Sequence, residues 1–298
     1  MRALITGGRG FVGGWLAEHL RGAGDEVVAI DREVEITDPT AVLAAVKDAA
    51  PDAVYHLAAL AHVGESWDDP LRVLEVNVLG TAAVLAAARQ CESDPRVLVT
   101  SSAEVYGAVT DPAVLPLTET APTAPLTPYA ASKLAAEAVC GQAVAGHGQA
   151  VIVVRPFNHI GPGQSPNFAV AALAHRIVKA LAEGDDHIAV GNLSARRDFT
   201  DVRDVVRAYR LLVERGKPGA IYNVCSGRDH SIQAVAETLL RQAGADLELR
   251  PDPELVRPVD VPVLRGDPGR LHQATGWKTE ISLDQTLADV LEWWRQSG

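Results

Sequence analysis

The segment Arg2-Ala-Leu-Ile-Thr-Gly-Gly-Arg-Gly-Phe-Val-Gly13 decides the fold of this 298-residue chain. Its apolar run ends in glycines at positions 7, 10 and 13, and apolar residues at helical spacing follow from Phe11 to about Arg21. This order predicts a strand, a tight turn and a helix. Glycine at these positions permits the turn, a close approach of the backbone to a bound anion, and tight packing of the helix on the strand.

The helix after this turn presents unpaired N–H groups at its N-terminus, where a pyrophosphate binds well. The turn therefore predicts a dinucleotide site, and a turn that needs glycine only for its conformation is the alternative. The candidate cofactor residues in the turn are Gly7, Gly10, Phe11, Val12 and Gly13.

Asp31 follows the second expected strand, at residues 27–30. A carboxylate at this point can accept hydrogen bonds from both ribose hydroxyls of NAD, and its charge repels a 2′-phosphate. The sequence therefore favours NAD(H), while Arg9 and Arg32 leave the use of NADP(H) open. A cap at the end of the strand is the alternative role for Asp31.

Strand and helix patterns alternate along the first half of the chain. Strands are expected at residues 27–30, 53–57, 97–100 and 151–154, and helices at residues 41–50, 70–89 and 128–144. This alternation predicts an α/β fold with a doubly wound parallel sheet of the Rossmann type.

The alternation stops after Arg155, where prolines and glycines become frequent. We expect a dinucleotide-binding domain over residues 1–156, to which residues 193–225 partly return. A smaller C-terminal α/β domain is expected to comprise residues 157–192 and 226–298.

The composition limits the partners. The chain has 27 Lys and Arg against 38 Asp and Glu, a formal net charge of −11, and no stretch gathers the basic residues. This argues against a nucleic-acid or anionic-membrane partner. No uncharged apolar window approaches the roughly 18 residues of a membrane span, and no signal-peptide pattern is present, so a cytoplasmic location is expected. The three cysteines and nine histidines lack metal-ligand spacing, so no metal is expected.

A tyrosine and a lysine four residues apart, in Tyr129-Ala-Ala-Ser-Lys133, share one face of an expected helix. A nearby ammonium lowers the pKa of a phenol, so Tyr129 is expected to exchange a proton with a substrate oxygen near neutral pH. Ser102 and Glu104 follow the strand at residues 97–100, at the sheet edge where ligands bind. Solvated helices also carry the Tyr-Lys spacing, so the interpretation depends on the dinucleotide turn.

Together the glycine turn, Ser102 and the Tyr129/Lys133 pair resemble the extended short-chain dehydrogenase/reductases that act on nucleotide-diphosphate sugars. Similar motifs are His56-Leu-Ala-Ala59, Asn77-Val-Leu-Gly-Thr81 and Ser101-Ser-Ala-Glu-Val-Tyr-Gly107, and the similarity covers essentially the whole chain. In that family such residues contact the cofactor or support the active-site helix. The resemblance implies that the cofactor residues also include Arg32, Glu35, Ile36, Leu57, Ala58, Ala59, Asn77, Tyr129, Lys133 and Pro156.

The C-terminal half resembles the GDP-sugar branch, which includes GDP-mannose 4,6-dehydratases and GDP-4-keto-6-deoxy-D-mannose reductases. The similar segments are residues 155–164, 191–201 and 257–268. Arg197 and Arg257 suit a diphosphate because a planar guanidinium binds phosphate oxygens bidentately, and an ion pair is their alternative role. The implied substrate residues are Ser102, Glu104, Tyr129, Asn158, Asn192, Arg197 and Arg257.

The resemblance implies an NAD(P)H-dependent reduction of the C4 keto group of a GDP-4-keto-6-deoxyhexose to GDP-D-rhamnose or its C4 epimer. The catalytic residues would be Ser102, Glu104, Tyr129 and Lys133. A 4,6-dehydratase is the alternative, because Glu104 matches the dehydratase base, although Ala103 stands where many dehydratases carry an acid. A 4-epimerase and a non-catalytic dinucleotide sensor are weaker alternatives. A homodimer formed through the helices at residues 70–89 and 128–144 is also implied.

Overall fold

The structure is a computed structural model that describes residues 1–109, 111–255 and 261–297. Its larger part is a six-stranded parallel sheet with the order β2, β1, β3, β4, β5, β9. These strands are β1 (Arg2–Thr6), β2 (Glu26–Ile30), β3 (Ala53–His56), β4 (Arg96–Thr100), β5 (Val151–Pro156) and β9 (Ile221–Val224). The strand order reverses between β1 and β3, which confirms the expected doubly wound α/β fold.

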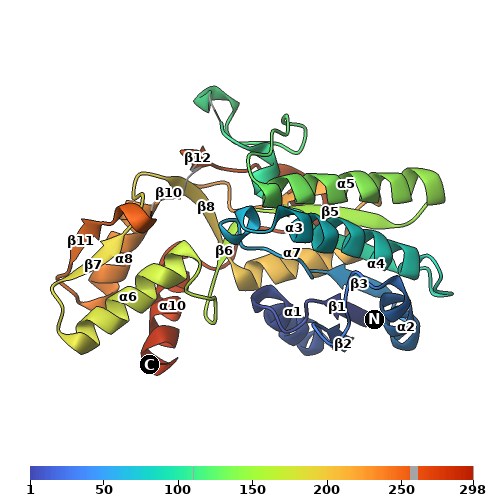
Figure 1. Ribbon diagram of the computed structural model, residues 1–298, viewed down its shortest axis with the longest axis horizontal. Coiled ribbons are helices and arrows are strands. Elements are labelled where there is room, and N and C mark those ends of the chain that lie inside the picture. The colour runs from blue at the N-terminus through green and yellow to red at the C-terminus, as the bar shows by residue number, and fades with distance from the viewer. Residues whose placement is uncertain (110, 256–260, 298) are drawn as a thin grey trace.

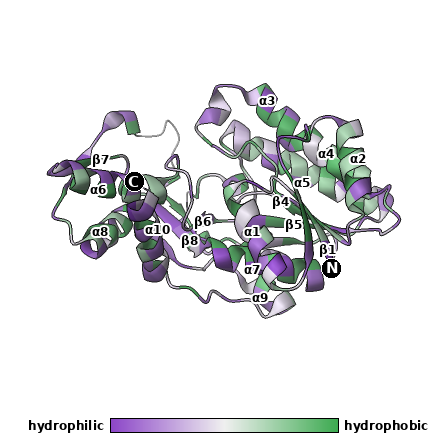
Figure 2. Ribbon diagram, turned by 90° about the horizontal axis from the view of Figure 1, so that it is seen from below, coloured by the Kyte–Doolittle hydropathy of each residue, from purple (hydrophilic) through white to green (hydrophobic). Residues whose placement is uncertain are grey.

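Helices cover both faces of this sheet (Figure 1). They are α1 (Phe11–Gly22) and α7 (Val202–Arg215) on one face, and α2 (Pro39–Ala49), α4 (Gly80–Ala88) and α5 (Pro128–His147) on the other. Successive strand residues enter opposite cores, so that Ile5 packs in the first core and Leu4 in the second. Both faces are therefore buried, and the strands are largely hydrophobic in Figure 2.

The helix expected at residues 70–89 is continuous but not uniform. It consists of α3 (Pro70–Leu74), the π-helical segment η2 (Glu75–Leu79) and α4. Among the described residues this is the one helical stretch long and apolar enough to cross a membrane. More than half of it is buried, and Val76, Ala83 and Val84 lie in the core beneath the sheet, so its apolar character is that of a core helix.

The smaller part of the molecule has its own core, formed by α6 (Ala169–Glu183), α8 (Ile232–Ala243) and α10 (Leu283–Ser297). In Figure 1 it lies beside the large sheet, at the end of the long strand β8 (Arg196–Asp201). Its other strands are β6 (Asn158–Ile160), β7 (His187–Val190), β10 (Asp229–Ser231), β11 (Glu248–Pro251) and β12 (Val263–Leu264). The 3₁₀ turns are η1 (Glu65–Trp67), η3 (Ala103–Tyr106), η4 (Pro112–Val114) and η5 (Pro253–Leu255).

The chain crosses between the two parts more than once. β9 pairs with β5, and α7 packs on α1, so both belong to the larger part. The short helix α9 (Gly269–Thr275) also packs there, against α7 and β9, although residues 226–298 were expected in the smaller part. Trp277 explains this position, because it is fully buried and its indole N–H donates to the Asp204 carbonyl at 2.9 Å. The expected domain boundaries remain a prediction.

Candidate active site

The glycine turn forms a close cradle between β1 and α1. Gly7 has a φ of +71°, and a Cβ at this position would lie 2.8 Å from the Ala58 nitrogen. A Cβ at Gly13 would lie 2.2 Å from the Gly7 oxygen. Gly10 is the N-cap of α1 and supplies no side chain to cap it, so the first N–H groups of the helix are available to an anion. The cradle therefore fits the pyrophosphate of a dinucleotide.

A buried histidine joins this cradle to the next strand. Thr81 Oγ1 donates to the Asn77 carbonyl and so accepts from His56 Nε2, at 3.1 Å. His56 Nδ1 then accepts from Thr6 Oγ1 at 2.7 Å, and Thr6 Oγ1 in turn accepts from the Ala58 N–H at 3.2 Å. Burial lowers the pKa of His56 to about 3, so the ring is neutral and this chain of hydrogen bonds is stable. Sequence reasoning assigned His56 no role of its own, and only its place before Leu57-Ala58-Ala59 could have indicated one.

Asp31 follows β2, beside the glycine turn, and lies among charged groups. Its carboxylate accepts from the backbone N–H groups of Arg9 and Arg32, at 2.9 and 3.0 Å. Glu33 accepts from the Asp31 N–H at 2.9 Å and forms an ion pair with the Arg9 guanidinium. Glu35 pairs with Arg72 of α3, 3.2 Å away. Ile36 is buried beside Gly80, so the segment after β2 is anchored on the helix layer.

Three consecutive residues at the end of β4 contact three successive turns of α5. The Thr100 carbonyl accepts from Lys133 Nζ at 2.8 Å, and Ser101 Oγ donates to Glu137 at 2.5 Å. Ser102 lies close enough to Tyr129 for its hydroxyl to lower the pKa of the phenol. Residues 129, 133 and 137 are four apart and share one helical face, so a single register of α5 on β4 places all three.

The expectation that Lys133 lowers the pKa of Tyr129 is wrong for this structure. Burial raises the pKa of Tyr129 to about 12, the hydrogen bond from Ser102 opposes the rise, and the charge of Glu104 adds to it. Lys133 Nζ lies 5.9 Å from the centre of the phenol ring and directs a proton to Thr100. Burial also lowers the pKa of Lys133 to about 8. Loss of water around both groups thus outweighs their mutual interaction.

A buried ion pair supports this face of α5. Arg155 at the end of β5 donates to both oxygens of Glu137, at 2.8 and 2.7 Å. Its guanidinium also lies 4.9 Å from the centre of the Tyr106 ring. Sequence reasoning missed this pair because the two residues lie on different elements, and the signal available was only that Glu137 continues the four-residue spacing of Tyr129 and Lys133.

Asn77 lies against the same helix. It donates to Ser132 Oγ at 2.9 Å and to the Leu60 carbonyl at 3.1 Å, and it accepts from the Leu60 N–H at 2.8 Å. These bonds connect η2, α5 and the segment after β3. Asn77 is fully buried, so its place beside α5 suits a supporting role.

The structure brings only some of the expected substrate residues close together. Asn158 begins β6 and is exposed; it pairs in register with Phe199 of β8, two residues from Arg197. Arg197 is 8% exposed and donates to the carbonyls of Arg196 and Val261, at 2.9 and 2.6 Å. Asn192 lies in the exposed loop between β7 and β8. Arg257 falls outside the described residues.

Asp198 organises the neighbourhood of Arg197 and was not expected from the sequence. Its carboxylate accepts from the Ser226 hydroxyl at 2.5 Å and from the N–H groups of Gly227 and Gly266, at 2.9 and 3.3 Å. Burial raises its pKa to about 6, and these hydrogen bonds oppose the rise. Asp198 thereby joins β8 to the segments that follow β9 and β12.

Comparisons with known proteins identify the family of this chain. The family model described as "NAD dependent epimerase/dehydratase family" matches residues 3–225. GDP-6-deoxy-D-mannose reductase of Pseudomonas aeruginosa is 39% identical over 98% of this chain and 97% of its own. The solved structure of RMD from Pseudomonas aeruginosa complexed with NADPH is 38% identical over 100% of both chains, with a TM-score of 0.93. The UDP-glucose 4-epimerase of Thermus thermophilus in complex with NAD is 29% identical over 100% of both chains, with a TM-score of 0.89.

Proposed function

The chain belongs to the NAD-dependent epimerase/dehydratase family, and from this premise we propose that it reduces the C4 keto group of a GDP-4-keto-6-deoxyhexose. The product would be GDP-D-rhamnose or its C4 epimer. The similarity to a GDP-6-deoxy-D-mannose reductase over 98% of the chain supports the substrate class.

The placement of Tyr129 is the observation that carries the proposed reduction: the phenol is buried at the end of β4 with Ser102, one helical turn from Lys133. A phenol with a pKa of about 12 keeps its proton at neutral pH, and it lies beside Ser102 in a site from which water is largely excluded. A reductase needs such a donor, because negative charge develops on the keto oxygen as C4 is reduced. A nicotinamide cofactor, when bound, would supply the hydride.

The chain's own groups complete the proton transfer. The Ser102 hydroxyl donates a hydrogen bond to the keto oxygen, and Tyr129 gives that oxygen its proton. The Lys133 ammonium, on the next turn of α5, stabilises the phenolate that remains. Asn158, Arg197 and Arg257 hold the nucleotide diphosphate, with Asn192 at the nucleotide.

A 4,6-dehydratase is the second candidate, and Glu104 is the observation that favours it. Its carboxylate is close enough to Tyr129 for its charge to raise the pKa of the phenol. A dehydratase also needs an acid beside this base, and the adjacent position is Ala103, a buried residue without an ionisable group.

The test supplies the purified enzyme with GDP-4-keto-6-deoxymannose and NADH, and separately with GDP-mannose and NAD. Consumption of NADH with formation of a GDP-6-deoxyhexose supports the reductase. Conversion of GDP-mannose to its 4-keto-6-deoxy form would establish the dehydratase instead. UDP- and dTDP-linked 4-keto sugars serve as controls for the nucleotide.

For the cofactor we propose NAD(H) in preference to NADP(H), with Asp31 on the adenosine ribose. The family description supports a nicotinamide cofactor, and relatives are solved with NADPH and with NAD. The glycine cradle, Asp31 and Lys133 are the residues that would hold it. Titration of the enzyme with NADH and NADPH tests the preference. A cytoplasmic location and the absence of nucleic-acid and membrane partners remain predictions.

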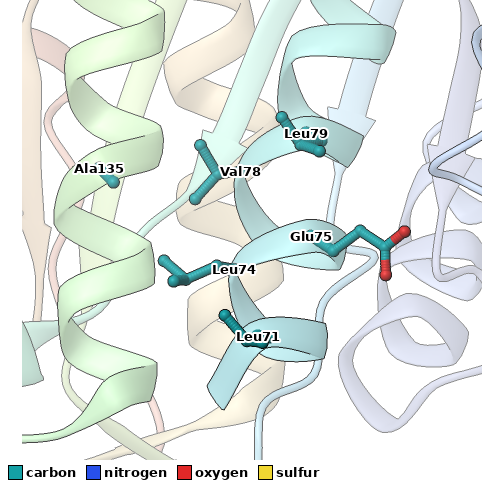
Figure 3. Close-up of a pocket in the computed structure, with 6 residues that line it drawn as sticks. All are labelled: Leu71, Leu74, Glu75, Val78, Leu79 and Ala135. Atoms are coloured by element: carbon teal, nitrogen blue, oxygen red, sulfur yellow. The ribbon is translucent and has the colours of Figure 1, made fainter. Parts of the chain in front are cut away.

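We also propose a homodimer, formed through the outer face of α3, η2 and α5. Leu71 and Leu79 are 77% and 59% exposed. A shallow groove of about 340 Å³ separates the helices, with Leu74 and Val78 directed toward Ala135 of α5 (Figure 3). An apolar face of this kind suits a two-fold contact with a second copy. A monomeric mass by light scattering, unchanged in a Leu71→Asp variant, would contradict the proposal.

A further inference from the structure

Glu33 stands two residues beyond Asp31, and neither the glycine motif nor the family resemblance gives it a role. We propose that Glu33 determines cofactor specificity: its carboxylate occupies the anion-binding position formed by the Arg9 guanidinium and the Asp31 N–H, and so excludes the 2′-phosphate of NADPH. The inference rests on the cofactor site proposed above and adds a second selecting residue to Asp31.

The contacts of Glu33 define this position. One carboxylate oxygen accepts from the Asp31 N–H at 2.9 Å, and the other pairs with the Arg9 guanidinium. The Arg9 N–H donates to Asp31 Oδ2 at 2.9 Å, so the backbone of Arg9 and its side chain are held by two different acids. Glu33 thus closes a bridge between the glycine turn and the end of β2.

The second arginine at this end provides a contrast. Arg32 is exposed, and in the described ranges its guanidinium forms no ion pair with a carboxylate. Arg9 and Arg32 both donate a backbone N–H to Asp31, and among the described residues only the Arg9 guanidinium of the two forms an ion pair with an acid. A 2′-phosphate would therefore find one cation available and the other already neutralised.

The chemistry of the two cofactors makes this difference selective. The ribose hydroxyls of NADH need an acceptor, which Asp31 supplies. The 2′-phosphate of NADPH needs cations and N–H donors, and the Glu33 carboxylate competes for one of each. Removing the Glu33 charge should leave NADH binding nearly unchanged and strengthen NADPH binding, because Arg9 becomes available to the phosphate.

The experiment measures dissociation constants of the full-length enzyme for NADH and NADPH by calorimetric titration, without turnover. Glu33→Gln is expected to tighten NADPH binding about three- to fivefold and to change NADH binding less than about twofold, the scale of an exposed charge pair. In an Arg9→Ala background the Glu33→Gln gain should vanish, and in an Arg32→Ala background it should persist.

Glu35→Gln is the matched control, because it removes the same charge two residues away while its partner is Arg72 of α3. It should improve NADPH binding less than Glu33→Gln does. A gain from Glu33→Gln that persists without Arg9, an equal gain from Glu35→Gln, or no gain at all would overturn the inference while leaving the cofactor site in place. Failure of the wild type to bind either dinucleotide would overturn the cofactor site and this inference together.

Discussion

The two ends of the proposed cofactor site differ in their access to water. At the end of β4, Ser102, Tyr129 and Lys133 are 8%, 9% and 5% exposed. At the end of β2, the side chains of Arg9 and Glu33 are 70% and 45% exposed. Burial moves the pKa of Tyr129 to about 12 and that of Lys133 to about 8.

This difference bears on what each end can achieve. Charge interactions are strong where water is excluded and weak where it is present. A change at the buried end should therefore alter the rate by orders of magnitude, while a change at the exposed end should alter cofactor preference by small factors.

Tyr129→Phe gives the largest expected effect. The substitution keeps the ring and removes the proton, so turnover should fall about 100-fold or more, while the dissociation constant for NADH stays nearly constant. Single-turnover rates with the keto sugar and a cofactor titration measure the two quantities. Tyr222→Phe is the control, because Tyr222 is also buried but its hydroxyl accepts from the Lys217 N–H. Near-normal turnover of the Tyr129 variant would show that the proton comes from elsewhere.

Lys133→Met gives the second-largest expected effect, and it should change how kcat/KM depends on pH. Lys133 of the free enzyme loses its proton near pH 8, so kcat/KM of the wild type should fall on the alkaline side of about pH 8. The Met variant should be at least about tenfold slower and should lack this alkaline limb. If kcat/KM of the Met variant still falls at alkaline pH, the titrating group is not Lys133.

The same substitution predicts a gain in stability. The folded-state pKa of about 8 lies below the ordinary lysine value of 10.5, so the folded protein disfavours the charged ammonium below pH 8. The stability of the wild type should therefore rise between about pH 8 and pH 10.5, where the unfolded chain binds the proton that the folded chain has lost. The Met variant should be more stable near pH 7, and its advantage should shrink across this window in denaturant titrations.

The sequence predicted the features that depend on neighbours along the chain. The glycines of the turn, the strand and helix alternation, and the Tyr129/Lys133 face are local patterns. Burial depends on the whole fold, and for this reason the predicted direction of the Tyr129 pKa was wrong. The partners of Ser101 and Glu137 depend on β4 and β5 being adjacent in the sheet, which no local spacing reveals.

Substrate residues were harder to predict than the cofactor turn. Asn158 and Arg197 come close only because β6 pairs with β8 in a second sheet. The sequence suggested that Arg197 is a phosphate ligand but did not show that its guanidinium already donates to two backbone carbonyls. The sequence indicated no role for Asp198 or Glu33, because their partners lie on other segments.

Ser101→Ala gives an intermediate effect and separates position from chemistry at the buried end. Ser101 donates to the charged Glu137, and a buried hydrogen bond of this type contributes about 1.5–3 kcal/mol. The free energy of unfolding should fall by about that amount, while Glu137 keeps both bonds from Arg155. Arg9→Ala, at the exposed end, should leave the melting temperature nearly unchanged. Equal losses of stability in the two variants would show that the buried and exposed ends do not differ in the strength of their charge interactions.

Asp31→Ala should give the smallest effect. It removes the charge that repels a 2′-phosphate, so the ratio of NADPH to NADH affinity should rise by about three- to fivefold, as expected for an exposed charge. The gain is limited because Glu33 still engages the Arg9 guanidinium. The double variant Asp31→Ala/Glu33→Gln should therefore exceed the product of the two single gains, because the phosphate can approach the Arg9 guanidinium freed by Glu33→Gln more closely once the Asp31 charge is gone. Titrations of all four proteins with both dinucleotides measure this coupling. Strictly multiplicative gains would mean that the two acids act independently. A loss of more than about 100-fold in NADH affinity for Asp31→Ala would show that substitutions at the exposed end have effects as large as those at the buried end.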